Sequence, residues 1–378
     1  MKNIIIATIS VLALATFSCK HNLEKKNEVL GPRLVAASAN LKVVDNSFKI
    51  SNLLPNFDLS QEVKITAKMN ESVTWKLIVK GLESSALKTY TSLSDSVNVS
   101  WKGESENIFF FRTGEKCVVE LSFLGNSTVI KDTLEVGKQK RYGGKLLSAG
   151  LYQPLLLSNG AKAYFVDDFE LVNASASSDS ANKLSDYFYS QADGPKPFYT
   201  PKYTEDVVQG KYCFYLSGKD NDNNTYCGSL NTEKLNAFSQ LIPKGTSTKD
   251  LYVNLYVYGY GNKYPNSSLL LIAYEVDDSS IDLANSLSTN NLYLYNNKKN
   301  DAYSYRVAVN WEGWKFISIP YDQFLASVST ISGFGNKVKE ADKFSGLGFS
   351  IDSFPNGGGE VAMKLDNIIV TVGGPFVQ

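Results

Sequence analysis

Between residues 41 and 138, apolar and polar side chains alternate in short runs bounded by Asn, Gly, Ser or Asp. A period of two is typical of half-buried β-strands, because successive side chains of a strand point to opposite faces. Turn signals at intervals of roughly 8 to 12 residues favour a sandwich. We therefore predict an N-terminal β-sandwich with strands over residues 63–69, 73–79, 97–101, 107–111, 117–123 and 129–136.

Residues 162–378 contain eight further runs of the same kind and no strongly amphipathic helix. This pattern favours a jelly roll of two packed sheets. The predicted fold class is therefore all-β, a sandwich followed by a C-terminal β-jelly-roll. Its strands are expected over residues 162–171, 211–218, 250–261, 268–276, 303–311, 314–321, 346–352 and 361–372.

The distribution of tyrosine separates the two parts. Of the 22 tyrosines, only Tyr90 lies before residue 142. Such a change in composition marks a domain boundary, and the Gly- and Lys-rich segment at 137–145 lies at that point. We place the linker at residues 139–161, between a sandwich of residues 41–138 and a jelly roll of residues 162–378.

The N-terminus has the pattern of an export signal. Lys2 precedes an apolar run over residues 4–15, which is too short to span a bilayer. Ser18 and Cys19 follow, and this ending resembles a bacterial lipoprotein lipobox of the Bacteroidetes type. The resemblance implies that residues 1–18 are a lipoprotein signal peptide, that Cys19 is acylated, and that residues 19–40 form a tether. The alternative is an ordinary cleaved signal that happens to precede a cysteine.

Charge and histidine content exclude several function classes. The chain has 38 basic and 38 acidic side chains, so it offers no excess positive charge to neutralise nucleic-acid phosphates. The single histidine, His21, lies in the tether. Histidine-dependent nucleophilic catalysis and histidine-ligated zinc are therefore excluded. An enzyme that uses only carboxylates is not excluded, since glycoside hydrolysis needs two acidic side chains.

Three motifs carry a resemblance to a known family. They are VDDFE at the start of the second part, NWEGWKFISIPYDQF in its middle and KLDNIIV near its end. In this order they resemble carbohydrate-binding modules with the galactose-binding-type jelly roll. The first part resembles the immunoglobulin-like spacer domains of bacterial surface proteins, on architecture alone. The resemblance implies a glycan ligand and, as a partner, an outer-membrane glycan importer.

The strand expected over residues 250–261 has two different faces. A period of two places on one face four aliphatic residues, expected to be core: Leu251, Val253, Leu255 and Val257. The other face carries Tyr252, Asn254, Tyr256, Tyr258 and Tyr260. Aromatic rings pack against the apolar faces of sugars, and hydroxyl and amide groups bind sugar hydroxyls. Neighbouring strands add Glu275 and Arg306 to this predicted ligand-binding surface.

Two alternatives to this surface stay open. Loops that cover the tyrosines would turn them into a second, minor core. Aromatic residues on long insertions are a second candidate surface, because insertions on a rigid sandwich often carry recognition residues. These are Tyr187, Phe188, Tyr189, Phe198, Tyr199, Tyr203, Tyr293 and Tyr295.

The family resemblance also implies a structural calcium ion between the first and last strands of the jelly roll. Its expected ligands are Asp168, Glu170 and Asp366, because carboxylate oxygens suit calcium. Cys213 and Cys227 flank a polar segment, read here as a hairpin tip, closely enough to form a disulfide in an oxidising compartment. Two reduced, half-buried cysteines are the alternative.

Together these features predict a non-catalytic, envelope-anchored glycan-binding lipoprotein that captures polysaccharide for uptake or degradation. Acyl chains on Cys19 would tie it to a membrane, expected to be the outer membrane. Two alternatives are kept. One is a carboxylate-dependent glycoside hydrolase or lyase with Asp167, Asp168, Asp277 and Asp278 as candidate acids. The other is a structural or adhesive envelope protein that binds a protein partner.

Overall fold

A computed structural model describes ten segments of the chain: residues 34–140, 142, 154–170, 188–192, 198–219, 226–232, 242–276, 300–327, 335–354 and 359–378. Within these segments, every regular element is a β-strand or a three-residue 3-10 helix. The predicted all-β fold class is confirmed. No helix in the described segments is long and apolar enough to cross a bilayer.

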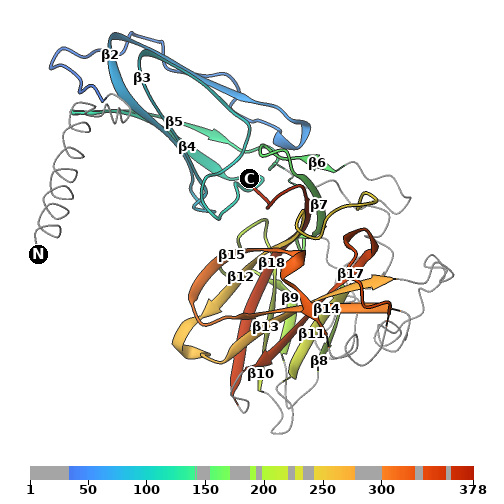
Figure 1. Cartoon of the computed structure of the whole chain (residues 1–378). Coiled ribbons are helices and arrows are strands. Elements are labelled where there is room, and N and C mark those ends of the chain that lie inside the picture. The colour runs from blue at the N-terminus through green and yellow to red at the C-terminus, as the bar shows by residue number, and fades with distance from the viewer. Residues whose placement is uncertain are drawn as a thin grey trace, which may run out of the picture.

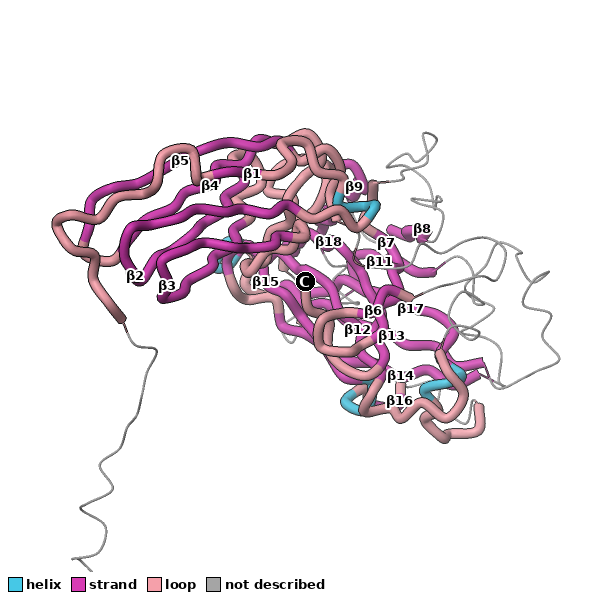
Figure 2. The backbone as a smooth tube through the Cα atoms, turned by 90° about the horizontal axis from the view of Figure 1, so that it is seen from above, coloured by secondary structure: helices cyan, strands magenta, loops and turns pink. Residues whose placement is uncertain are grey.

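The N-terminal strands form one antiparallel sheet in the order β1-β2-β4-β5, with β3 also paired to β2. Strand β2 is long, and its pairing shifts between Lys68 and Val73, so the two expected strands at 63–69 and 73–79 are one strand. Figure 2 shows β2 and β3 running side by side. The bounds are β1 Lys49–Ile50, β2 Val63–Gly81, β3 Leu87–Trp101, β4 Lys116–Phe123 and β5 Asn126–Glu135.

Buried side chains alternate along β2, and together with those of β3 to β5 they form one core that includes Trp75 and Trp101. The strand predicted over residues 107–111 is wrong, because this segment is an irregular loop. The loop keeps Phe111 in the N-terminal core, where its ring centroid lies 4.8 Å from that of Trp101. It also carries Phe110 to the C-terminal domain, as described below.

The C-terminal domain consists of two antiparallel sheets. The seven-stranded sheet has the order β15-β12-β18-β10-β9, with β7 paired to the far part of β18 and β6 to β7. The six-stranded sheet has the order β16-β14-β13-β17-β11-β8. The bounds are β6 Leu155–Leu156, β7 Lys162–Asp167, β8 Phe188–Ala192, β9 Phe198–Tyr203, β10 Cys213–Lys219, β11 Tyr226–Thr232, β12 Leu251–Tyr260, β13 Ser267–Val276, β14 Asn300–Ala308, β15 Glu312–Pro320, β16 Leu325–Ala326, β17 Phe344–Ser353 and β18 Glu360–Val372.

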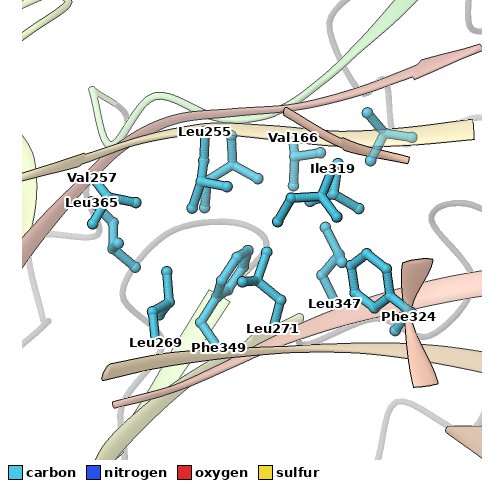
Figure 3. Close-up of a cluster of buried hydrophobic side chains, with 14 of the residues drawn as sticks. Val166, Leu255, Val257, Leu269, Leu271, Ile319, Phe324, Leu347, Phe349 and Leu365 are labelled. Atoms are coloured by element: carbon cyan, nitrogen blue, oxygen red, sulfur yellow. The ribbon is translucent and has the colours of Figure 1, made fainter. Parts of the chain in front are cut away.

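The main core of this domain lies between the two sheets. Leu255 and Val257 of β12 point toward Leu269 and Leu271 of β13, with Phe349 between them (Figure 3). Burial of these apolar side chains is the dominant favourable contribution to the folding of the domain. Each of the eight predicted strands of the second part is present, with ends shifted by a few residues.

Strands β10 and β11 do not form the predicted hairpin, because they belong to different sheets. Packed sheets lie about 10 Å apart, whereas the Cα atoms of a disulfide lie within about 7 Å. Cys213 is buried and free, as is Cys117. The predicted bridge between Cys213 and Cys227 is therefore not formed.

The two domains meet through a third buried cluster. It joins Phe110 of the N-terminal domain to Tyr256 of β12 and to Phe376 of the C-terminal tail, residues 373–378. The ring centroids of Phe110 and Tyr256 lie 5.6 Å apart. The amide Nε2 of Gln378 donates to the carbonyl of Asn107 at 3.1 Å. The C-terminus accordingly lies where the domains meet (Figure 1).

Candidate functional site

Strand β12 has one apolar and one aromatic face, as its alternation predicts. Its four aliphatic side chains are fully buried in the main core. On the other face, Asn254 and Tyr256 are buried, whereas Tyr258 and Tyr260 are partly exposed. The partly exposed end of this face is therefore the place to look for a ligand site.

A row of side chains crosses the seven-stranded sheet at Tyr258. Tyr258 pairs with Trp314 of β15 on one side and with Lys364 of β18 on the other. Lys364 in turn pairs with Tyr215 of β10. Directly paired residues of antiparallel strands point to the same face of a sheet. The four side chains therefore lie in one line across four strands.

Three further tyrosines enlarge this row into a surface. We define the aromatic platform as the six rings of Tyr203, Tyr215, Tyr258, Tyr260, Tyr264 and Trp314. Their ring contacts are edge-to-face, except for the stacked pair of Tyr203 and Tyr215, whose centroids lie 4.8 Å apart at 20°. Each ring is only partly buried, so the platform presents aromatic surface to solvent.

Lys364 lies among the rings of the platform. Its side chain is 2% exposed, and its Nζ lies 4.2 Å from the ring centroid of Tyr258 and 4.9 Å from that of Tyr203. It donates to the carbonyl of Glu205 at 2.9 Å and lies 3.6 Å from the carboxylate of Asp206. Burial lowers the pKa of Lys364, against the pull of nearby negative groups. Lys364 therefore links the rings of Tyr203 and Tyr258 to residues 205 and 206, and its ammonium group is not available to a charged ligand.

Residues 204–209, named here the bridging loop, border the platform. The carbonyl of Asp206 accepts a hydrogen bond from the indole of Trp314, and the carboxylate of Glu205 accepts one from the hydroxyl of Tyr203 at 2.8 Å. Burial and the Glu205 carboxylate raise the pKa of Tyr203 to about 12. Asp366 Oδ2 accepts from the backbone amides of Val208 and Gln209, each at 3.1 Å.

Asn254 and Tyr256, two of the predicted ligand residues, are buried and present almost no side-chain surface to solvent. Asn254 Nδ2 donates to the carbonyl of Ile369 at 3.1 Å, and its Oδ1 accepts from the backbone amide of Phe376 at 3.1 Å. Tyr256 packs against Phe110 and belongs to the interdomain cluster. For Asn254 and Tyr256, the alternative of a second, minor core is correct. The N-terminal domain and the C-terminal tail cover these two residues.

Three other predicted ligand residues lie apart from the platform. Tyr252 pairs with Pro320 and Thr371, at the other end of β12. Glu275 is buried, and its Oε1 accepts from the hydroxyl of Tyr321 at 2.6 Å. It lies on β13 of the six-stranded sheet.

Arg306 lies on β14, also in the six-stranded sheet. Its guanidinium binds both carboxylate oxygens of Asp352, at 2.6 and 2.7 Å, and lies 4.3 Å from the ring centroid of Phe354. The expected grouping of Arg306 and Glu275 with the tyrosines is wrong, because β13 and β14 do not adjoin β12.

The predicted calcium ligands do not fit a metal site. Within the described segments, no three or more His, Cys, Asp or Glu side chains are arranged to hold a metal ion. Asp168 Oδ1 accepts from the amide of Glu170 at 3.1 Å. Glu170 Oε1 accepts from the amides of Lys211 and Tyr212 at 2.6 and 2.8 Å. Glu170 and Asp366 thus hold the backbone of residues 208–212, whereas Asp168 accepts from the amide of Glu170. Calcium binding by the chain stays a prediction.

Several predicted features lie outside the described residues or their described side chains. They are Cys19, Asp167, Tyr187, Phe188, Tyr189, Phe198, Tyr199, Cys227, Asp277, Asp278, Tyr293 and Tyr295. In contrast, Tyr215, Tyr264 and Trp314 belong to the platform, and Lys364 lies among its rings, but the sequence does not identify any of them as ligand residues. Lys364 in the buried, mostly apolar strand over residues 361–372 is a usable signal, because a buried strand rarely carries a charge without a partner.

No protein-family model matches the chain, and no curated protein matches it. Among solved structures, a family 11 carbohydrate-binding module from Clostridium thermocellum in complex with a β-1,3-1,4-mixed-linked tetrasaccharide is 15% identical. The match covers 56% of this chain and 96% of the module, with a TM-score of 0.31. The protein SGBP-B from a xyloglucan utilization locus in Bacteroides uniformis is 13% identical over 87% of this chain and 72% of its own, with a TM-score of 0.30. Scores of this size assign no function to the chain.

Proposed function

We propose that this protein is a non-catalytic glycan-binding lipoprotein of the cell envelope and that the aromatic platform binds the glycan. The observation that carries the proposal is the line of Trp314, Tyr258 and Tyr215 across one sheet face, with partly exposed rings on either side of Lys364. Exposed aromatic residues grouped on one face are uncommon on a surface without a binding role.

The chemistry of the platform favours a neutral sugar polymer. Indole and phenol rings pack against the apolar C–H faces of pyranose rings, while phenol hydroxyls bind sugar hydroxyls. The ammonium group of Lys364, next to the rings, already binds the carbonyl of Glu205 and lies beside the carboxylate of Asp206. The chain as a whole has a formal net charge of zero and no field to attract an acidic polymer.

The contacts of Glu205 and Asp206, the two acidic residues beside the platform, favour a binding role over hydrolysis. Glycoside hydrolases place two carboxyl groups on either side of the scissile bond. Here Glu205 and Asp206 are adjacent in the chain, and both already contact a neighbour, Tyr203 and Lys364 respectively. The proposed function is capture of polysaccharide for uptake or degradation by other proteins.

The proposed anchor is Cys19, from its position after the apolar run and Ser18. Acyl chains on this residue would hold the two domains at the outer membrane. A glycan importer in that membrane is the proposed partner. Labelling with a fatty-acid analogue tests the anchor, since Cys19→Ala should abolish the label.

A glycan array probed with residues 34–378 tests binding, followed by calorimetry with the polysaccharides that bind. Trp314→Ala should weaken binding by about 2 kcal/mol, the size of a typical aromatic hot spot. Tyr252→Ala is the matched control, because Tyr252 lies on the same sheet face in a row with Pro320 and Thr371. Equal losses in the two variants, or an array without any bound glycan, would contradict the proposal.

A further inference from the structure

The bridging loop is held from three directions. Its backbone accepts hydrogen bonds from Trp314 and Lys364, both in the aromatic row. Its amides at Val208 and Gln209 donate to Oδ2 of the buried carboxyl group of Asp366. The third set of contacts comes from the N-terminal domain, some hundred residues earlier in the chain.

Arg112 and Phe110 supply this third set. Arg112 Nη2 donates to the carbonyl of Val207 at 2.8 Å, and the amide of Phe110 donates to the carbonyl of Val208 at 3.2 Å. The Phe110 ring packs on Tyr256, which lies two residues from Tyr258 on the same strand face. The N-terminal domain therefore contacts both the loop beside the platform and the row next to it.

The contacts from Arg112 and Phe110 lie next to a residue of the bridging loop with an uncommon backbone conformation. Asp206 adopts the left-handed region with φ of 48°, which residues other than glycine occupy seldom, although aspartate does so more often than most. Contacts from the surroundings help to hold such a conformation. Asp206 is the residue whose carbonyl binds Trp314 and whose carboxylate lies beside Lys364. A loop released at Val207 would therefore lose the geometry that orients both side chains.

We propose that the N-terminal domain positions the aromatic platform, and that Arg112 is the positioning residue that acts through the bridging loop. The N-terminal domain is then part of the binding unit and not only a spacer. As a proposal about glycan affinity it rests on the proposed function, whereas the effect on the orientation of Trp314 does not.

The test compares a protein of residues 34–378 with its variants Arg112→Ala and Arg112→Lys and with a control variant, Lys131→Ala. Lys131 lies on β5 in an exposed ion pair with Glu120 at 2.7 Å. Each protein is labelled with 5-fluorotryptophan, which gives one ¹⁹F resonance for each of the four tryptophans. Trp314→Phe assigns the resonance of Trp314, and Trp75, in the N-terminal core, reports on folding of that domain.

In Arg112→Ala the Trp314 resonance should shift while that of Trp75 stays in place, and Arg112→Lys should shift it less because lysine keeps a donor. Affinity electrophoresis in gels that contain mixed-linkage β-glucan, xyloglucan or galactomannan measures binding. Where a polysaccharide retards the wild type, Arg112→Ala should bind it about fivefold more weakly, the equivalent of one net hydrogen bond. Lys131→Ala should match the wild type in both measurements.

A Trp314 resonance that is the same in wild type and Arg112→Ala would overturn the proposal, as would a shift of equal size in Lys131→Ala. If no polysaccharide of the panel, or of the array, binds the wild type, the proposed function fails. The comparison of ¹⁹F resonances still decides whether the N-terminal domain positions the platform.

Discussion

Two tyrosines on one strand, Tyr256 and Tyr258, have the same chemistry and point to the same face of β12, yet their surroundings differ. Tyr256 is 3% exposed beneath Phe110 and the C-terminal tail. Tyr258 is partly exposed and contacts Trp314 and Tyr260. The difference is made by segments far away in the chain, residues 107–112 and 373–378. Alternation within a strand determines which face a residue occupies, and distant segments determine whether that face is covered.

The largest expected effect is a loss of stability when the buried Tyr256 is replaced. Tyr256→Ala removes a buried ring that packs against Phe110 and Phe316, and it leaves a cavity between the domains. We expect a loss of about 3 kcal/mol in the free energy of unfolding, measured by urea denaturation. A variant as stable as the wild type would mean that the interdomain cluster is not closed in solution.

Replacement of the partly exposed Tyr258 should instead affect glycan binding more than stability. Tyr258→Ala should weaken glycan binding by about 2 kcal/mol, as measured by calorimetry. Its unfolding free energy should change by less than the loss in Tyr256→Ala, because the ring is already partly in water. Tyr258→Phe is the control that keeps the ring and removes only the hydroxyl. If Tyr258→Ala loses stability and keeps its affinity, the platform is a structural feature.

The comparison also shows what the sequence can and cannot reveal. The aliphatic face of β12 and the eight runs of the second part were predictable, because a period of two is a local property of the chain. The segment at 107–111 has the sequence pattern of a strand, because its apolar residues form a continuous run. Phe110 does not lie in a strand; its apolar side chain is buried against the C-terminal domain.

The candidate site was predictable only in part, because it is assembled from strands that are distant in the chain. Tyr258 and Tyr260 were identified from β12 alone, but Tyr215 and Lys364 join them through the pairing of β18 with β10 and β12. The same pairing excludes Glu275 and Arg306, which lie in the other sheet. The Cys213–Cys227 bridge failed for a related reason, since neighbours in sequence were assumed to share a sheet.

An effect of similar size is expected from Gly210, which follows the bridging loop and has φ of +65°. A side chain on this residue is strained and would overlap the carboxylate of Glu170. Gly210→Ala should therefore cost about 2 kcal/mol in thermal or urea unfolding. Gly245→Ala is the matched control, because Gly245 also has a positive φ of +78° but no atoms within 4 Å of the added carbon. Equal costs in the two variants would show that the overlap with Glu170 is relieved without loss.

The smallest effect concerns Asp366, which lies in the covered row beside Tyr256. Burial raises its pKa well above the ordinary value of 3.8, although hydrogen bonds from Gln209 and Asn367 act in the other direction. Between pH 3.8 and the raised pKa, the folded state then keeps a proton that the unfolded state has lost. The stability that Asp366 contributes is complete below that value and is lost as the pH rises toward the raised pKa.

The difference in unfolding free energy between wild type and Asp366→Asn should therefore shrink as the pH rises from about 4 to about 7. Asp95→Asn is the control. The pKa of Asp95 is lowered by its hydrogen bond with Lys68, so its contribution is present above the ordinary value and is lost only at lower pH. Between pH 4 and 7 its difference from wild type should stay level. A difference that grows with pH for Asp366→Asn would mean that the amides of Val208, Gln209 and Asn367 stabilise the ionised carboxylate more than burial destabilises it. The bridging loop would then be held by a buried anion, and its contacts would strengthen toward neutral pH.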